Sequence, residues 1–476
     1  MTKEFRFLVG GEWRESGEKM YIANPFNGTA VGLLSLAQEE DADEAIRNSA
    51  EIFSTLKNLS SYERSKILSA ISDDLERRRD EFAEMIANES GKPIRFAKGE
   101  VDRAVSTFHI ASEEATRIEG EVISLDVSPA FGGMKNRKGI TTRFPIGPIV
   151  CITPFNFPLN LIAHKIAPAI ACGNPFIVKP PPQAPLTSLL LGETLLKSGL
   201  PKQAVNIVPC SNDVAEKLAT DDRVKMLSFT GSARVGWTLK QKAGKKKILL
   251  ELGGNAAVIV DRNADLDYAV ERCVTGSFAQ AGQVCIKVQR MYVHKSVFKQ
   301  FEMKFLEAAA AVKVGNPLEE DTIVGPMISL AEAERVESWV KEAVSDGATL
   351  LWGGKRRGSM IEPTVLGSVN PEMKVCREEI FGPVTTLHNV DSVEDAVEEV
   401  NDSRYGLQAG IFSADMKAIF YAYKNLEVGG VIVNDYPTFR VDNMPYGGVK
   451  DSGFGREGIK YAIEEMTEPR LLAIEF

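Results

Sequence analysis

The sequence is poor in the residues on which several kinds of site depend. It has four widely spaced histidines and six scattered cysteines, with no C-x-x-C pair and no Cys/His cluster. A zinc centre and a histidine-based active site are therefore not expected, and no metal is predicted. The cysteines lie mostly in apolar runs, which indicates reduced thiols in a cytoplasmic protein and not a disulfide framework.

An excess of basic residues and a long apolar run are also missing. The net charge of −9 argues against nucleic acid or an anionic membrane as a partner. The most apolar stretch, 159–172, contains His164, Lys165 and Pro168 and is too short to span a bilayer. Residues 1–14 carry several charges and no apolar core, so no signal peptide is expected.

The chain does contain a regular alternation of apolar strands and amphipathic helices. With 476 residues, 44% of them hydrophobic, it is long enough for two or three domains. Between 147 and 254 the alternation predicts a parallel sheet covered on both faces, as in doubly wound nucleotide-binding folds. A second alternation from 256 to 433 predicts another α/β domain, with a ligand cleft between the two. The first set of strands is expected at 149–153, 176–179, 205–209, 226–230 and 248–251, and helices before it at 41–53, 61–89 and 96–118.

Residues 121–147 have a different character. A basic turn at 135–138, flanked by glycines, separates two possible strands and predicts a projecting hairpin. The tail 470–476 is expected to be a strand that pairs with 140–144. Such an arm is suited to pairing with another chain.

Two short stretches carry chemically active side chains. Cys285 follows a glycine-containing turn, where the backbone can lower the pKa of an exposed thiol; the alternative is an ordinary buried small side chain. Glu251 lies within the apolar run 248–252, where an isolated charge is costly. Burial would raise the pKa of Glu251 and suit it to accept a proton, although a structural ion pair is the alternative.

These two stretches together resemble the aldehyde dehydrogenase superfamily. The family carries Glu-Leu-Gly-Gly, here at 251–254, and then Gly-Gln-x-Cys, here ending 34 residues after Glu251 at Cys285. Further matches are TPFNFP at 153–158, FTGS at 229–232, EIFGP at 379–383 and GGVKDSG at 447–453, so the resemblance covers nearly the whole chain.

The resemblance implies an α/β fold of two doubly wound domains with a β-arm for oligomerisation. Residues 1–120 and 147–253 would form the dinucleotide-binding domain, and residues 254–446 the catalytic domain. Residues 121–146 and 458–476 would form the arm, through which the protein is expected to be a homodimer or homotetramer.

The resemblance also implies NAD or NADP as cofactor. The turn 230–236 opens a helix with Ser232 as the expected N-cap, where free N–H groups can hold a phosphate. The turn has no G-x-G-x-x-G fingerprint, so by itself it fits a plain capped helix. Pro182 stands where many NAD-preferring members have Glu, whose carboxylate repels a 2′-phosphate; this leaves NADP, or both cofactors, open. The residues expected to contact the cofactor are Thr153, Pro154, Phe155, Lys179, Pro182, Thr230, Gly231, Ser232, Gly236, Leu252, Glu379 and Phe381.

The implied reaction oxidises an aldehyde to its acid. The Cys285 thiolate attacks the aldehyde carbon, and the Asn156 amide with the Cys285 N–H stabilises the oxyanion. Hydride passes to the nicotinamide, and Glu251 activates the water that hydrolyses the thioester. Without the other motifs, Asn156 would be an ordinary turn residue.

The substrate is the least defined part of this prediction. The resemblance places an apolar acyl pocket at Phe157, Val284, Ile286 and Phe439, which suits small aliphatic, hydroxy- or semialdehydes. Residues 458–467 also resemble the non-phosphorylating glyceraldehyde-3-phosphate dehydrogenases, a branch close to the lactaldehyde dehydrogenases. Arg103 and Arg440 match two of their phosphate-binding arginines, whereas Val284 replaces a third.

Two other readings stay open. A CoA-acylating semialdehyde dehydrogenase would pass the thioester to CoA, but members of that branch generally lack the base at Glu251. A non-catalytic structural protein of the same fold would need none of Cys285, Glu251 and Asn156.

Overall fold

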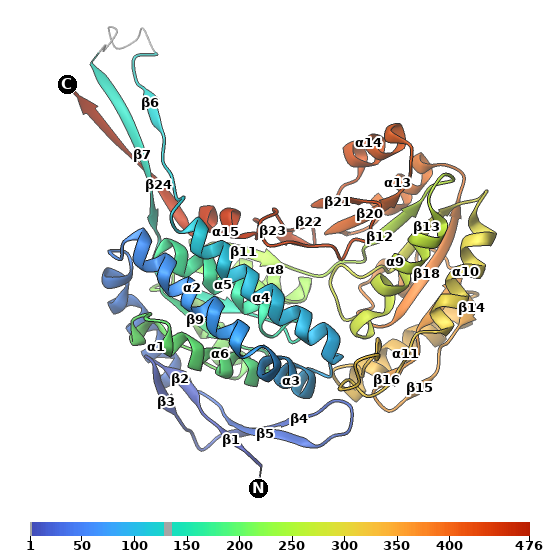
Figure 1. The fold of residues 1–476 in the computed structure, drawn as a ribbon, viewed down its shortest axis with the longest axis horizontal. Helices are drawn as coiled ribbons and strands as arrows, with labels where there is room; N and C mark the ends of the chain where they lie inside the picture. The colour runs from blue at the N-terminus through green and yellow to red at the C-terminus, as the bar shows by residue number, and fades with distance from the viewer. Residues whose placement is uncertain (1, 128–135) are drawn as a thin grey trace.

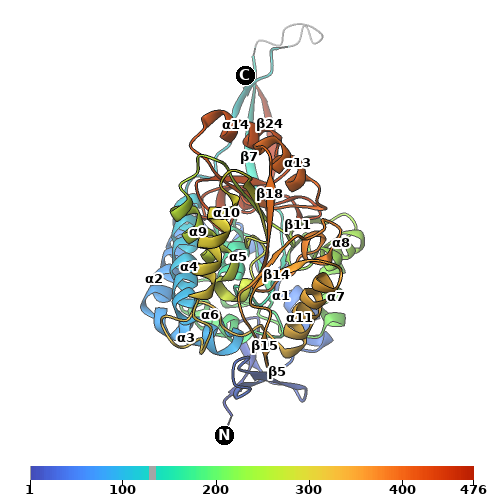
Figure 2. The ribbon, with the colours of Figure 1, turned by 90° about the vertical axis from the view of Figure 1, so that its right-hand side faces the viewer.

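The computed structural model describes residues 2–127 and 136–476 and contains two large sheets and a projecting arm (Figure 1, Figure 2). The first sheet has the strand order β23-β11-β10-β8-β9, in which β23 is antiparallel and the other strands are parallel. Its strands are β8 (Ile149–Ile152), β9 (Phe176–Lys179), β10 (Met226–Thr230), β11 (Lys247–Glu251) and β23 (Gly453–Phe454). The four predicted strands at 149, 176, 226 and 248 are thus confirmed.

The second sheet has seven strands in the order β14-β17-β18-β13-β12-β20-β21 and is parallel except for β14. Its strands are β12 (Ala257–Val260), β13 (Arg290–His294), β14 (Thr349–Trp352), β17 (Thr364–Gly367), β18 (Val384–Val390), β20 (Gln408–Phe412) and β21 (Gly430–Val433). The mixed α/β architecture that the sequence predicts is therefore present, with one doubly wound sheet on each side of Figure 1.

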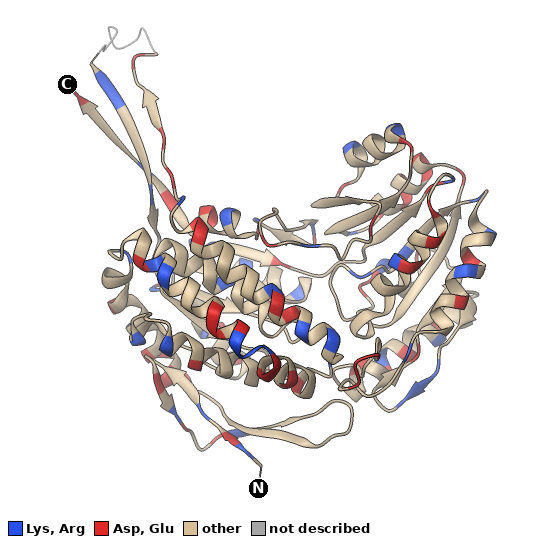
Figure 3. Ribbon diagram, viewed as in Figure 1, with Lys and Arg blue, Asp and Glu red and all other residues tan. Residues whose placement is uncertain are grey.

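Helices cover both sheets, and charged residues of both signs are interspersed along the outer helices (Figure 3). Those around the first sheet are α1 (Glu39–Leu56), α2 (Ser61–Arg77), α3 (Arg79–Ser90), α4 (Ile94–Glu114), α5 (Asn160–Cys172), α6 (Leu186–Lys197), α7 (Asn212–Thr220), α8 (Ala233–Lys242) and α15 (Ile459–Glu465). Those around the second are α9 (Leu266–Phe278), α10 (Phe298–Ala310), α11 (Leu330–Ser345), α12 (Lys374–Arg377), α13 (Val393–Asn401) and α14 (Met416–Asn425). Within the described ranges, no helix is both long and apolar enough to cross a membrane.

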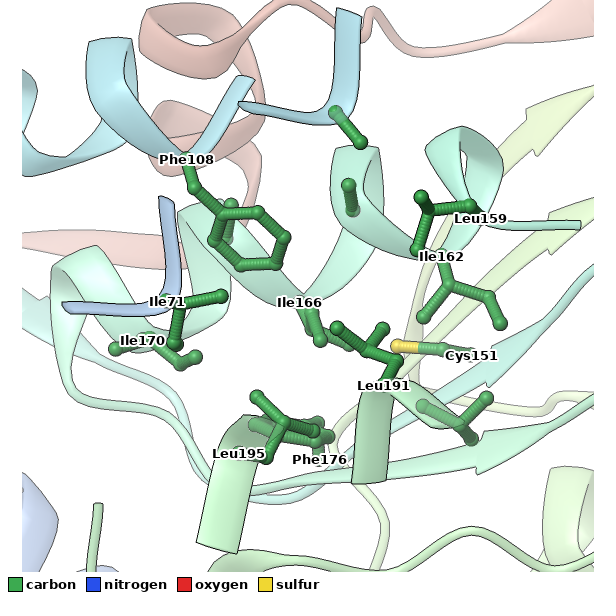
Figure 4. Packing of buried hydrophobic residues seen from close by; sticks show 14 of the residues in the cluster. Ile71, Phe108, Cys151, Leu159, Ile162, Ile166, Ile170, Phe176, Leu191 and Leu195 are labelled. Carbon is green, nitrogen blue, oxygen red and sulfur yellow. The ribbon is translucent and has the colours of Figure 1, made fainter. Parts of the chain in front are cut away.

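Helix α5 is buried along its whole length and forms the centre of the larger core. Figure 4 shows Ile162, Ile166 and Ile170 of α5 packed among side chains from the neighbouring helices and strands. These neighbours are Ile71, Phe108, Cys151, Phe176, Leu191 and Leu195. Because burial on all sides removes the need for a polar face, α5 has a nearly continuous apolar sequence. Residues 153–159 directly precede α5, and the burial of Leu159 and of the helix anchors this segment in the core.

Two local predictions were wrong. The helix expected at 61–89 is broken at Arg78, whose backbone has φ −99° and ψ 18°. The Arg78 side chain donates hydrogen bonds to Glu81 and Glu193, which fixes the break. The strand expected at 205–209 forms only isolated bridges, from Ile207 to Leu8 and to Val178.

The arm is a three-stranded antiparallel sheet of β6 (Val122–Ser124), β7 (Arg137–Pro145) and β24 (Thr467–Glu475). The predicted pairing of the tail is confirmed, since Leu471 lies opposite Thr141 and Leu472 opposite Ile140. Residues 128–135, which include Lys135 of the predicted turn, lie outside the described residues.

The remaining strands belong to small sheets of two or three strands. They are β1 (Glu4–Phe5), β2 (Phe7–Val9), β3 (Glu12–Arg14), β4 (Lys19–Ala23), β5 (Ala30–Ser35), β15 (Arg356–Arg357), β16 (Met360–Ile361), β19 (Tyr405–Gly406) and β22 (Val449–Lys450).

Candidate active site

A cavity of about 330 Å³ is lined by residues of β10 and β11 in the first sheet, of the helices α4, α5 and α11, and of several loops. Most of the predicted site residues lie on its wall: Arg103, Pro154, Phe155, Asn156, Phe157, Thr230, Gly231, Ser232, Glu251, Leu252, Val284, Cys285, Ile286, Glu379, Phe381 and Arg440. Thr153, Lys179, Pro182, Gly236 and Phe439 are predicted site residues that do not line it.

Cys285 reaches the cavity on a strained turn. After α9 ends at Phe278, the backbone enters the left-handed region at Gln280 (φ 55°), Ala281 (φ 54°) and Gly282 (φ 66°). Two of these residues are not glycine, and such strain is concentrated at functional sites. Of the six cysteines, all of which are described, only Cys285 is partly exposed. The structure therefore separates it from the five inert, buried thiols.

Glu251 is the last residue of β11 and projects into the cavity with an unsatisfied carboxyl group. Both of its oxygens are buried and have no hydrogen-bond partner within the described residues. Burial raises the pKa of Glu251 well above its usual range, and the neighbouring Glu457 raises it further. A buried acid with free oxygens and a raised pKa is suited to taking a proton from a water or a thiol.

Asn156 is tied to the loop that carries Cys285. Its Nδ2 donates to the Gln283 carbonyl oxygen at 3.1 Å, and Gln280 Nε2 donates to the Asn156 carbonyl oxygen at 2.6 Å. One N–H of the Asn156 amide is left for a ligand. These two bonds lock the Asn156 loop to the nucleophile loop, as an oxyanion site requires.

The surroundings of the thiol include a residue that sequence reasoning missed. The Tyr446 hydroxyl lies 3.3 Å from Cys285 Sγ. Burial raises the pKa of the Cys285 thiol to about 12, whereas the hydrogen bond with Tyr446 lowers it. The only sequence signal was its place directly before the glycines at 447–448.

The end of β10 has the features expected of a phosphate site. Ser232 occupies the N-cap position of α8, but its side chain makes no capping hydrogen bond. The first N–H groups of α8 are thus left free for a ligand, where the helix dipole favours an anion. The Thr230 hydroxyl oxygen is buried without a partner. A Cβ at Gly236 would lie 2.4 Å from Leu252 Cδ2, so a glycine here permits close packing of α8 on Leu252.

Two further groups fit a nicotinamide dinucleotide. Glu379 accepts a hydrogen bond from the Gly254 N–H at 3.1 Å, and burial raises the pKa of its carboxyl group to about 7. Phe381 has a positive φ of 46° and packs edge-to-face on Phe155, with ring centroids 6.0 Å apart. Glu332 and Arg335 also line the cavity and were not predicted from the sequence.

Lys179 lies beyond the cavity, at the end of β9. It is 5% exposed, and among the described residues no carboxylate contributes to its electrostatic surroundings. Burial lowers the pKa of this lysine, and an unpaired buried ammonium is costly without a ligand. Thr153 directly follows β8, and its N–H donates to the Lys179 carbonyl oxygen at 3.4 Å. The Thr153 hydroxyl is buried without a partner, and Pro182 is exposed.

A network of charged side chains also contributes to the cavity wall. Arg440 donates to Glu457 at 3.1 Å, and Arg103 donates to Asp442 at 3.2 Å. His164 bonds Asp442 at 2.7 Å, and burial lowers the pKa of this histidine to about 4. Nε of each arginine is buried without a partner. His164, Glu457 and Asp442 were not predicted from the sequence, because nothing in the local pattern marks them.

Apolar side chains line the cavity beside Cys285. Val284 and Ile286 flank the thiol and are buried, and the Phe157 ring stacks over the Lys92 ammonium at 3.7 Å. Phe439 is 45% exposed and lies outside the cavity wall. No group of three or more potential metal ligands occurs among the residues described.

Comparisons with known proteins agree with this geometry. The profile of the aldehyde dehydrogenase family matches residues 13–472. The 3-sulfolactaldehyde dehydrogenase of Priestia aryabhattai is 45% identical over 475 residues, which cover 99% of this chain and 98% of the relative. The solved structure of aldehyde dehydrogenase 21 from Physcomitrella patens, in complex with the reaction product succinate, has a TM-score of 0.97 at 44% identity and covers 100% of this chain and 99% of that chain. Glyceraldehyde-3-phosphate dehydrogenase GapN from Methanocaldococcus jannaschii, complexed with NADP, has a TM-score of 0.92 at 40% identity and covers 97% of this chain and 100% of that chain.

Proposed function

The chain belongs to the aldehyde dehydrogenase family and oxidises an aldehyde with NAD or NADP, and we propose that Cys285, Glu251 and Asn156 carry the reaction. The observation that supports this assignment is their convergence on one cavity, Glu251 from the end of β11 and the other two from separate loops. A scaffold protein would gain nothing from a partly exposed thiol on the same cavity as an unsatisfied buried acid.

The mechanism begins at the sulfur. The Cys285 thiolate attacks the aldehyde carbon, and the Asn156 amide and the Cys285 N–H bind the resulting oxyanion. NAD or NADP, when bound, would supply the acceptor for the hydride that leaves the thiohemiacetal carbon. Glu251 then takes a proton from water as it attacks the thioester carbon, which releases the acid and the thiolate. The cofactor would be held by residues from the ends of the first-sheet strands and from the loops at the cavity, namely Thr230, Gly231, Ser232, Leu252, Pro154, Phe155, Glu379, Phe381 and Lys179.

Replacement of the nucleophile tests this assignment. Cys285→Ala should abolish aldehyde oxidation while NADP binding, followed by calorimetry, is unchanged. Cys273→Ala, which removes a fully buried thiol from α9, is the control and should retain turnover. Aldehyde oxidation by the Cys285→Ala protein would refute the assignment.

The substrate that we propose is a small aldehyde with an anionic group at its far end. Arg103 and Arg440 both line the cavity, and each keeps an unpartnered Nε. The names of the relatives point the same way, with a sulfonate, a phosphate and a dicarboxylate. The free acid, and not an acyl-CoA, is the expected product because Glu251 is present. Non-phosphorylating oxidation of glyceraldehyde 3-phosphate remains the alternative within this class.

A substrate series separates these readings. Succinic semialdehyde, 3-sulfolactaldehyde and glyceraldehyde 3-phosphate should give a higher kcat/KM than butanal. Arg103→Gln should raise KM for the anionic aldehydes about tenfold and leave KM for butanal unchanged. Lys202→Gln, on the surface far from the cavity, is the control. An equal effect of Arg103→Gln on butanal would argue against tail binding.

The domain roles and the assembly are also proposed. Residues 1–120 and 147–253 would bind the dinucleotide, 254–446 would carry the thiol, and 121–146 with 458–476 would join subunits into a homodimer or homotetramer. Exposed apolar side chains on the arm support the last point, namely Val122, Leu471, Leu472 and Phe476. Six unbridged cysteines support a reducing compartment, such as the cytoplasm.

A further inference from the structure

Tyr446 is held against the reactive sulfur by several independent contacts. Its N–H donates to the Glu457 carbonyl at 2.9 Å, and the Glu457 N–H donates back to the Tyr446 carbonyl at 2.7 Å. The Arg440 guanidinium stacks on its ring at 3.7 Å and is itself anchored on the Glu457 carboxylate. The side chain is 4% exposed, so its hydroxyl cannot turn towards bulk water. The position 3.3 Å from Cys285 Sγ is therefore built into the fold.

The charged groups around the sulfur make a hydrogen bond from the Tyr446 hydroxyl important for the stability of the thiolate. Glu379 and Glu251 both lie close enough to oppose a negative charge on Cys285, whereas Arg440 favours it. Arg440 makes no hydrogen bond to the sulfur, and its nearest anion is Glu457. Among the described side chains, Tyr446 alone is within hydrogen-bond distance of Sγ. A hydrogen bond to an ionised acceptor is about twice as strong as a neutral one.

We propose that Tyr446 is a further catalytic residue, whose hydroxyl donates a hydrogen bond to the Cys285 sulfur whenever that sulfur is anionic. This inference rests on the proposed role of Cys285 as nucleophile. It concerns two steps of the cycle. Before attack, the bond stabilises the thiolate; the sulfur then forms the C–S bond and the carbonyl oxygen takes the electron pair. After Glu251 has taken a proton from the attacking water, the tetrahedral adduct collapses, the C–S bond breaks, and the departing thiolate accepts the same hydrogen bond.

The rate of alkylation by iodoacetamide reports the thiolate without requiring turnover. We compare Tyr446→Phe with the wild type between about pH 6 and 7.5, below the ordinary pKa of a cysteine thiol, which burial raises further for Cys285. Alkylation of Cys285 should be about three- to tenfold slower at each pH, since the loss of thiolate is partly offset by the greater nucleophilicity of a more basic sulfur. Tyr292→Phe removes a buried hydroxyl from the second sheet, away from the cavity, and serves as the matched control. Cys285→Ala gives the background labelling.

The outcomes are separable. Wild-type alkylation rates in a folded Tyr446→Phe protein would overturn the proposal, even if Cys285→Ala is inactive as expected. Retained turnover in Cys285→Ala would instead refute the proposed function itself. If Tyr446→Phe does not fold, Tyr446→Met, which also lacks a hydrogen-bond donor, carries the same test: alkylation about three- to tenfold slower supports the proposal, and wild-type rates overturn it.

Discussion

The backbone of Gly254 lies directly against the backbone of Cys285. A Cβ at Gly254 would be 2.7 Å from the Cys285 carbonyl oxygen, and a Cβ at Gly253 would be 2.2 Å from Glu379 Oε2. Real Cβ atoms do not approach so closely. The two glycines after Glu251 therefore allow the proposed base, the nucleophile loop and the carboxylate of Glu379 to meet at one place.

Gly254→Ala should lower kcat on the order of 100-fold, because the added methyl group displaces the Cys285 backbone from its reacting position. Gly315→Ala is the control, since its Cβ would meet only the Thr322 hydroxyl, at 3.6 Å. Steady-state kinetics and the unfolding midpoint are measured for both variants. Wild-type kcat in Gly254→Ala would show that the close approach is irrelevant to the reaction.

Glu251→Gln should leave acylation intact and slow hydrolysis by about 10²- to 10⁴-fold. Stopped-flow absorbance should then show a burst of one reduced cofactor per subunit followed by a slow phase. Glu307→Gln, on the exposed face of α10, should show no such change. A slow rate without a burst would place Glu251 before hydride transfer instead.

The pH profile of hydrolysis provides a second check on Glu251. Burial holds its pKa above the usual value for a glutamate, and only the ionised form accepts a proton. Wild-type hydrolysis should therefore fall as the pH drops through that raised pKa and level off above it. The residual rate of Glu251→Gln should lose this acid limb, and an acid limb that persists would assign it to another group.

Pro182→Glu should shift the cofactor preference towards NAD. A carboxylate at this exposed position after β9 would repel a 2′-phosphate and could accept from the ribose hydroxyls. The ratio of kcat/KM for NADP to that for NAD should fall at least about tenfold. Gln183→Glu adds the same charge one residue later and should have little effect on the cofactor preference. Equal shifts in both variants would show that the preference responds to added negative charge in general and not to a carboxylate at position 182.

Leu472→Asp should disrupt the proposed assembly. Leu472 lies on the arm opposite Ile140, and its side chain is 58% exposed in one subunit. A charge buried between subunits without a partner costs several kcal/mol, so light scattering should detect a smaller species. Leu318→Asp replaces another exposed leucine away from the arm and should not change the mass. An unchanged mass for Leu472→Asp would exclude this part of the arm from the interface.

The sequence by itself determined the features that depend on short segments. The apolar strands ending at Lys179, Thr230 and Glu251 and the pairing of the tail with 140–144 are all visible in local patterns. The class of enzyme and the nicotinamide cofactor followed from motifs that matched a family, and both are confirmed. The domain boundaries and the roles of individual residues stay predictions.

Only the tertiary structure decided which side chains surround the sulfur and the base. Tyr446 is 161 residues from Cys285 in sequence, and the loop that carries it is placed by the bridge between Tyr446 and Glu457. Likewise, the neighbours that raise or lower the pKa of Glu251 come from α5 and from the segment 440–457. No periodicity records such contacts, because they arise from the packing of distant segments around buried charges, whose energy depends on every partner in the cluster.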